Sequence, residues 1–94
     1  MADPAGILPR MHRVVLYSRD GCHLCDVART VLEDVRAAHP FELTEVDVDT
    51  DDALIRDLGY RVPVVSLDGE ELFEIEVDAD RLAELVRAPV TPIG

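Results

Sequence analysis

Two cysteines three positions apart, Cys22 and Cys25, constrain the fold of this 94-residue chain more than any other feature. They follow residues 13–18, a β-rich apolar run that is continuous rather than alternating, which is typical of a strand buried on both faces. Residues 19–21, Arg-Asp-Gly, are turn-forming. From Cys22 onward the apolar residues recur with the period of a helix. The pair is therefore predicted to stand where a buried strand ends and a helix begins.

The start of a helix gives the two thiols different roles. Unpaired N–H groups and the helix dipole favour an anion there, so we expect Cys22 to be held as the reactive thiolate. Residues three apart share one helix face, with Cα atoms roughly 5 Å apart, which is within the range of a disulfide. We predict that Cys22 attacks a disulfide and that Cys25 resolves the mixed disulfide that forms. Arg19 and His23 are candidate supporting residues, because a positive charge near Cys22 would favour its thiolate.

Two other interpretations of the cysteine pair stay open. A zinc site needs four ligands, and the histidines that could complete one are His12, His23 and His39. His23 lies between the cysteines and is badly placed to join both, so we expect no metal. The cysteines could also be two thiols without a redox role. A structural disulfide explains the pair poorly, because closing so short a loop restricts the unfolded chain little.

The first helix and the segment after it show clear periodicities. The helix is predicted to begin at Cys22 and to end before Pro40, with an apolar stripe formed by Leu24, Ala28, Val31, Leu32 and Val35. Residues 41–48 alternate between apolar and polar, as a half-buried strand does. A short helix is expected over residues 51–58, capped by Asp49 or Thr50.

The last third of the chain predicts a hairpin and a helix. Strands are expected at residues 62–67 and 70–75, joined by an Asp68-Gly69 turn. Asp78 is placed to cap a last helix with apolar positions at Leu82, Leu85 and Val86.

The order of these elements is β-α-β-α-β-β-α, which defines an α/β fold. Strand, helix, strand implies a parallel pair with a right-handed crossover, and the hairpin adds an antiparallel pair. We therefore predict one mixed four-stranded sheet with three helices. Residues 13–87 form the expected domain, with a loose leader at residues 1–12 and a tail at residues 88–94.

The charge of the chain excludes several kinds of partner. The sequence has nine arginines, no lysine and 20 acidic residues, for a net charge of −11. Nucleic acids and anionic membrane surfaces need a basic footprint, so neither is expected as a partner. Residues 42–85 carry 15 of the acidic residues and would repel an anionic partner. There is neither a signal-peptide pattern nor an apolar run of roughly 18–20 residues, so we expect a cytoplasmic protein. We also expect a monomer, because no apolar stripe is left over once the core is assigned.

Residues 14–25 resemble the strand–turn–helix opening of glutaredoxins and other small thioredoxin-fold redoxins, and Val62-Pro63 resembles their Val-Pro. The chain is most similar to a glutaredoxin-like family with a Cys-His-Leu-Cys active site, over about residues 13–87. The resemblance implies a thiol–disulfide oxidoreductase that reduces protein or small-molecule disulfides. It also implies that Pro63 is cis and faces the cysteines, and that Val62 offers its backbone to an extended substrate.

Departures from the family pattern bear on the reductant and on the alternative function. Glutathione-dependent relatives carry Gly-Gly-Asp before the last helix, whereas here only Asp78 fits and acidic residues precede it. The side chains that replace the two glycines block the close approach of glutathione to the backbone, which weighs against glutathione as co-substrate. A flavoprotein reductase is an equally open alternative as the reductant. Leu16 stands where thioredoxins keep a buried Asp. The alternative to an oxidoreductase is a non-catalytic or metal-binding thioredoxin-fold module, whose acidic hairpin and last helix dock a basic partner.

Overall fold

The computed structural model describes residues 11–89. Most of the predicted leader and tail, residues 1–10 and 90–94, lies outside the described residues. The elements are β1 (Arg13–Ser18), α1 (His23–Ala38), β2 (Glu42–Asp47), the short 3₁₀ helix η2 (Val48–Thr50), α2 (Asp52–Leu58), β3 (Val64–Leu67), β4 (Glu70–Glu74) and α3 (Ala79–Arg87). Within residues 11–89, no helix is both long enough and apolar enough to cross a membrane.

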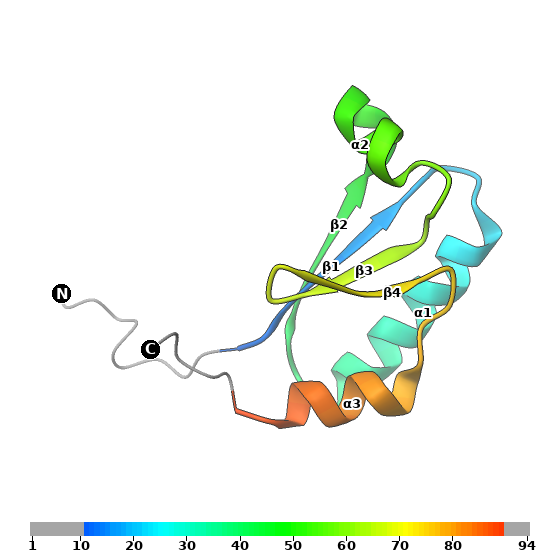
Figure 1. The fold of residues 1–94 in the computed structure, drawn as a ribbon. Helices are drawn as coiled ribbons and strands as arrows, with labels where there is room; N and C mark the ends of the chain where they lie inside the picture. Colours follow the sequence, from blue (N-terminus) through cyan, green and yellow to red (C-terminus); the bar gives the residue numbers. More distant parts are fainter. Residues whose placement is uncertain (1–10, 90–94) are drawn as a thin grey trace, which may run out of the picture.

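The four strands form one mixed sheet in the order β2-β1-β3-β4 (Figure 1). β1 pairs with β2 in parallel and with β3 antiparallel, and β3 pairs antiparallel with β4. The predicted fold class, a mixed four-stranded sheet with three helices, is therefore confirmed. β1 is a central strand, but only one of its faces is fully buried: Val14, Leu16 and Ser18 are buried, whereas Val15 and Tyr17 on the other face are half-buried. The prediction that both faces of this strand are buried is therefore correct for one face only.

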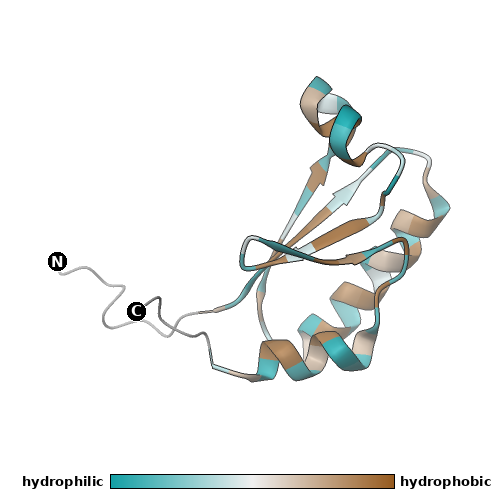
Figure 2. Ribbon diagram, in the orientation of Figure 1, coloured by the Kyte–Doolittle hydropathy of each residue, from teal (hydrophilic) through white to brown (hydrophobic). Residues whose placement is uncertain are grey.

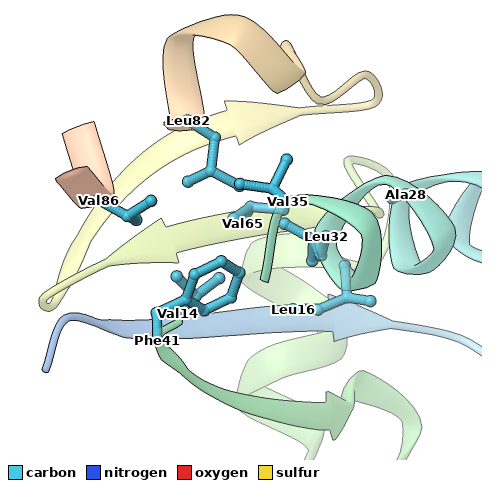
Figure 3. Close-up of a cluster of buried hydrophobic side chains, with 9 residues drawn as sticks. All are labelled: Val14, Leu16, Ala28, Leu32, Val35, Phe41, Val65, Leu82 and Val86. Atoms are coloured by element: carbon cyan, nitrogen blue, oxygen red, sulfur yellow. The ribbon is translucent and has the colours of Figure 1, made fainter. Parts of the chain in front are cut away.

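The core lies between the sheet and the two helices α1 and α3. Buried side chains from β1, β3, α1, α3 and the residue before β2 meet there (Figure 3): Val14, Leu16, Ala28, Leu32, Val35, Phe41, Val65, Leu82 and Val86. Apolar residues alternate with polar ones along α1 and α3 (Figure 2). Each of these helices buries an apolar stripe against the sheet and exposes a polar face. α2 lies beyond the end of β2, away from α1 and α3 (Figure 1), and buries no residue fully.

Leu24 does not belong to the buried stripe of α1, contrary to the prediction. It is 46% exposed, and Cys25 takes the buried position at the start of the stripe, ahead of Ala28 and Leu32. Spacings of three and four residues from Cys25 keep these side chains on one face, whereas Leu24 lies about 100° to the side.

Several element boundaries differ from the expected ones by a few residues. β3 begins at Val64 because Pro63, which has no N–H, ends up in the preceding loop. The cap of α2 is Asp51 rather than Asp49 or Thr50: its carboxylate accepts the Ala53 N–H at 2.7 Å. The two predicted caps belong to η2, which the sequence pattern did not indicate.

The predicted hairpin turn is confirmed at Asp68-Gly69. Leu67 pairs with Glu70, so two residues form the connection between β3 and β4. Both have positive φ, 52° for Asp68 and 93° for Gly69, which is the requirement of a type I′ turn.

The topology brings several loops to one end of the sheet. Ser18 pairs with Asp47, Tyr17 with Val64, and Val64 with Glu74, so all four strands reach this end together. The segments that leave it are residues 19–22 before α1, residues 59–63 before β3 and residues 75–78 before α3 (Figure 1). The cysteine pair therefore shares its end of the sheet with the Val62-Pro63 segment.

A buried histidine closes the opposite end of the sheet. His12, which we assigned to the leader, is only 9% exposed. Its Nδ1 lies 2.6 Å from Asp68 Oδ2 and its Nε2 lies 2.7 Å from the Ala88 carbonyl oxygen. The Arg13 N–H donates to the other Asp68 oxygen at 2.8 Å. Because a carboxylate and a carbonyl only accept, both ring nitrogens donate, so His12 is an imidazolium that ties α3 to the hairpin.

The charged form of His12 makes stability depend on pH. Burial lowers the pKa of His12, but its bonds to Ala88 and Asp68 outweigh burial and raise the pKa above its usual value. The stabilisation is therefore complete below about pH 6.5 and is lost as the pH rises through the folded-state pKa. We expect His12→Gln to cost about 1–3 kcal/mol at pH 5.5 and less at pH 9, measured by urea unfolding.

The control for this prediction is His23→Gln, which removes an exposed histidine. It should keep the fall in the urea midpoint with rising pH that the His12 bonds produce. The interpretation of His12 would be wrong if the His12→Gln variant kept the pH dependence of the parent chain. Asp68 is the charged group bonded to His12, and Arg13 contributes its backbone N–H, while its guanidinium lies near Glu42.

Candidate active site

Cys22 is the N-cap of α1. Its backbone is extended, with φ −95° and ψ 109°, and its Sγ accepts the Cys25 N–H at 3.1 Å. The Cys22 carbonyl accepts the Asp26 N–H at 3.2 Å, which is the first bond of the helix. Gly21 has φ 76°, a value that favours glycine in the turn before the cap. The Cys22 sulfur therefore receives a backbone N–H at the positive end of the helix dipole, where an anion is stabilised.

Cys25 lies one turn inside α1 and is fully buried, whereas Cys22 is half-buried. Burial is the largest cause that raises the pKa of the Cys25 thiol, and its hydrogen bond to Cys22 adds to it, giving about 11. The backbone amide of Arg19 and the charge of Arg29 act in the opposite direction. Both sulfurs are free thiols, so the structure describes the reduced pair. Cys25 is consequently protonated at neutral pH.

Arg19, one of the predicted supporting residues, binds groups outside the cysteine loop. Its guanidinium makes a bidentate pair with Asp49, with the Nη2–Oδ1 distance at 2.9 Å, and its Nη1 donates to the Gly59 carbonyl at 3.3 Å. Bonding to Asp49 raises the pKa of Arg19. The side chain therefore connects the loop before Cys22 to η2 and to the end of α2. These partners are 30 and 40 residues away along the chain, and no local pattern indicates them.

Arg29, which the sequence analysis missed, forms a polar cluster beside Cys25. Its Nη2 lies 2.5 Å from Glu45 Oε2 on β2, and its Nη1 lies 2.7 Å from Asp26 Oδ1. The Ser18 hydroxyl donates to Glu45 at 2.6 Å. These bonds to Arg29 lower the pKa of Glu45 and raise that of the arginine. The position of Arg29, four residues after Cys25 on the same helix face, was the available signal.

An open cavity of about 510 Å³ adjoins this cluster. It lies between the end of β1, the start of α1 and β2, and its lining is entirely polar apart from a glycine: Ser18, Arg19, Asp20, Gly21, Asp26, Arg29, Glu45 and Asp47. It opens beside the loop that leads into Cys22.

The Val62–Pro63 peptide bond is cis, as the resemblance predicted. The Pro63 carbonyl accepts the Ile75 N–H at 2.7 Å, which joins the loop before β3 to the loop before α3. Val62 is half-buried, and no hydrogen bond within residues 11–89 uses its backbone amide or carbonyl. These two groups are free to pair with an extended segment.

The remaining predicted site residues have simple environments. His23 is exposed as the first residue of α1. Asp78 caps α3, as predicted, because its Oδ1 accepts the Arg81 N–H at 3.0 Å. That capping bond occupies one carboxylate oxygen of Asp78. The contact of Asp78 with a substrate stays a prediction.

The histidines that could complete a zinc site lie apart from the cysteines. His39 follows the last turn of α1, so a 16-residue helix of about 24 Å separates it from Cys22. His12 is bound at the other end of the sheet. Within residues 11–89, no three His, Cys, Asp or Glu side chains gather closely enough to hold a metal ion.

This architecture defines a thioredoxin-fold protein: a mixed sheet, a Cys-X-X-Cys pair at the start of the first helix and a cis-proline loop at the same end. Residues 13–87 match the family described as Glutaredoxin-like domain (DUF836). The chain belongs to this family.

Known proteins support the assignment at several degrees of similarity. The uncharacterized protein Rv0508 of Mycobacterium tuberculosis is 34% identical over 82 residues, covering 81% of this chain and 84% of its own. Protein XcR50 from X. campestris is 42% identical, with a TM-score of 0.65 and coverage of 81% of this chain and 99% of that structure. A mutant thioredoxin from Halobacterium salinarum is 26% identical, with a TM-score of 0.63 over 90% of this chain and 80% of its own.

The different environments of the two thiols predict selective alkylation. A thiol with a pKa of about 11 is ionised in about one molecule in a thousand at pH 8, and only the thiolate reacts quickly. Iodoacetamide at pH 8 should therefore label Cys22 at least about tenfold faster than Cys25, as measured by mass spectrometry of the peptides.

The control is the same reaction in concentrated urea, where both thiols are exposed and should react at similar rates. Equal labelling of Cys22 and Cys25 in the folded protein would contradict the assigned environments.

Proposed function

We propose that this chain is a thiol–disulfide oxidoreductase that reduces disulfides through Cys22 and Cys25. The observation that carries the proposal is the cap of α1: the Cys22 sulfur accepts the Cys25 N–H at 3.1 Å while the Cys25 thiol is buried behind it. One sulfur is thus accessible at the N-terminus of α1, where the helix dipole favours an anion, and the other is buried one turn inside the helix. A redox function also agrees with the glutaredoxin-like family and the thioredoxin likeness.

The first step transfers the substrate to the protein. The Cys22 thiolate attacks one sulfur of a substrate disulfide, a bond forms between them, and the other substrate sulfur leaves as a thiolate with the electron pair. The substrate segment lies along Val62, whose free backbone N–H and C=O pair with it as with an added strand. Pro63, joined to Val62 by the cis peptide bond, is the last residue of this loop before β3.

The second step releases the substrate. Cys25 loses its proton to solvent and attacks the Cys22 sulfur, which forms the Cys22–Cys25 disulfide and expels the second substrate thiolate. The substrate has then gained two electrons and the protein has lost two. Arg29 assists because its positive charge, near Cys25, favours the thiolate that must form. A thiol reductant, either glutathione or a flavoprotein reductase, returns the pair to the dithiol.

A reducing compartment suits this cycle. The resting dithiol must be regenerated after each turnover, and the cytoplasm keeps thiols reduced. We propose a cytoplasmic location on this ground. No tightly bound cofactor is needed, because the sulfurs themselves carry the electrons.

Single serine variants test the proposal. Cys22→Ser removes the nucleophile, so reduction of a protein disulfide with a dithiol reductant should fall to the uncatalysed rate. Cys25→Ser removes only the resolving thiol, so it should accumulate a mixed disulfide between Cys22 and the substrate, visible by non-reducing mass spectrometry.

Unchanged turnover in the Cys22→Ser variant would end the assignment. Stoichiometric zinc in protein purified under reducing conditions would instead favour the binding-module alternative, because the cysteines would then be metal ligands.

A further inference from the structure

The segments at the end of the sheet that carries Cys22 bear several exposed apolar side chains. Leu24 and Val27, in the first turns of α1, are 46% and 47% exposed, Tyr60 before β3 is 95% exposed, and Ile75 after β4 is 38% exposed. Figure 1 shows that the segments carrying them leave the sheet at the same end. Scattered apolar residues need no explanation, but several around one reactive group are typical of an interaction surface.

Hydrogen bonds between the loops hold this surface in place. Arg19, in the loop before Cys22, donates to the carbonyl of Gly59, and this bond places Tyr60 next to that loop. The Ile75 N–H donates to Pro63 at 2.7 Å, which fixes the third loop against the second. The surface is therefore built from three segments that are bonded to one another rather than from independent loops.

Ile75 has an unusual backbone that turns the chain at this surface. Its φ is 71°, which is rare for a β-branched residue, and the Glu76 N–H donates to the Glu74 carbonyl at 2.8 Å across it. These features form a γ-turn centred on Ile75. The turn ends β4 and leaves both the Ile75 side chain and the neighbouring Glu76 exposed. Backbone strain of this kind is often retained at functional sites.

The charges around the surface are predominantly negative. Arg19 pairs with Asp49, and Arg61 pairs with both Glu71 and Glu74, so these cations are neutralised. Within residues 11–89, four carboxylates at this end have no ion-pair partner: Asp20, Asp47, Glu76 and Asp78. Two of them, Asp47 and Asp78, cap helices through single oxygens. Because the arginines of these loops are already paired, the negative potentials of the four carboxylates add up around Cys22.

We infer that the substrates of this site are polypeptide disulfides whose attacked cysteine is flanked by basic residues and by an apolar side chain. The apolar side chain rests among Leu24, Tyr60 and Ile75, and the basic residues face Asp20 and Glu76. The same charges repel small disulfides that carry carboxylates. This inference rests on the proposed function and names its substrate class.

Matched peptides test the charge preference. Each peptide carries one cysteine joined by a disulfide to a chromogenic thionitrobenzoate, with either two arginines or two glutamates as neighbours. The Cys25→Ser variant attacks the peptide sulfur, forms the Cys22–peptide disulfide and releases the coloured thiolate, so its rate reports the first step alone. The arginine peptide should react at least about tenfold faster at low salt, and the ratio should shrink in about 0.5 M NaCl.

Charge variants identify the responsible surface. Asp20→Asn with Glu76→Gln, added to Cys25→Ser, should reduce the ratio at low salt by several-fold. The matched control is Glu33→Gln with Asp34→Asn, which removes the same charge from exposed positions on α1 about 16–18 Å along the helix from Cys22. The control should keep most of the ratio. Tyr60→Ala should lower the preference for a peptide with leucine beside the cysteine over one with glycine.

The outcomes separate this inference from the function on which it rests. If both peptides react no faster than with the Cys22→Ser, Cys25→Ser double variant, the proposed oxidoreductase function fails. If both react quickly through Cys22 at equal rates, or if the glutamate peptide reacts faster, the function stands and the substrate inference is overturned.

Discussion

The bond from the Cys25 N–H to the Cys22 sulfur is the interaction on which the rest of the site depends. It makes a cysteine the first residue outside α1, at the helix end that stabilises an anion. The apolar spacing of α1 then puts Cys25, Ala28 and Leu32 on the face that packs against the sheet. One backbone contact thus separates two chemically identical side chains into an accessible sulfur and a buried one.

The sheet supplies the second constraint. Because β1 and β4 both run toward the start of β3, the loops after them arrive beside the cis-proline segment. Polar contacts then join these loops: Arg19 reaches Gly59, and the Ile75 N–H reaches Pro63. At the opposite end, His12 holds the hairpin to α3. The core between α1, α3 and the sheet is consequently closed at both ends by bonds between residues that are distant in the sequence.

Features with a local cause could be predicted from the sequence. A cap needs only a side chain near the N–H groups that follow it, so the cap Asp78 was predicted from its position before a helical segment. Cys22 was predicted as the first residue of the helix and is its N-cap, one residue before His23. The Asp68-Gly69 turn depends on two neighbouring residues that tolerate positive φ. The cis bond at Pro63 came from the family resemblance, not from local pattern. The α2 cap was placed two residues or one residue too early, because four of the five residues from Asp47 to Asp51 are able to cap a helix and η2 uses part of that segment.

Features that depend on distant partners could not be predicted. Arg19 was interpreted by its distance along the chain from Cys22, whereas its guanidinium pairs with Asp49. Arg29 was not predicted as a site residue, because its partner Glu45 lies 16 residues away on an edge strand. His12 was assigned to the leader because neither Asp68 nor Ala88 is near it in sequence. Leu24 was wrongly predicted to be buried, because helical spacing alone does not show whether the sheet covers an apolar side chain.

The sequence by itself determined the order of the elements, the position of the cysteine pair at the start of a helix and the excess of acidic residues after residue 41. These follow from periodicity, capping and composition, which act over a few residues. Only the tertiary structure decided which carboxylates neutralise the arginines and which acidic residues stand free around Cys22. Such distinctions depend on strand register and on the end of the sheet at which each loop emerges, and those are set by contacts between parts of the chain that are far apart in sequence.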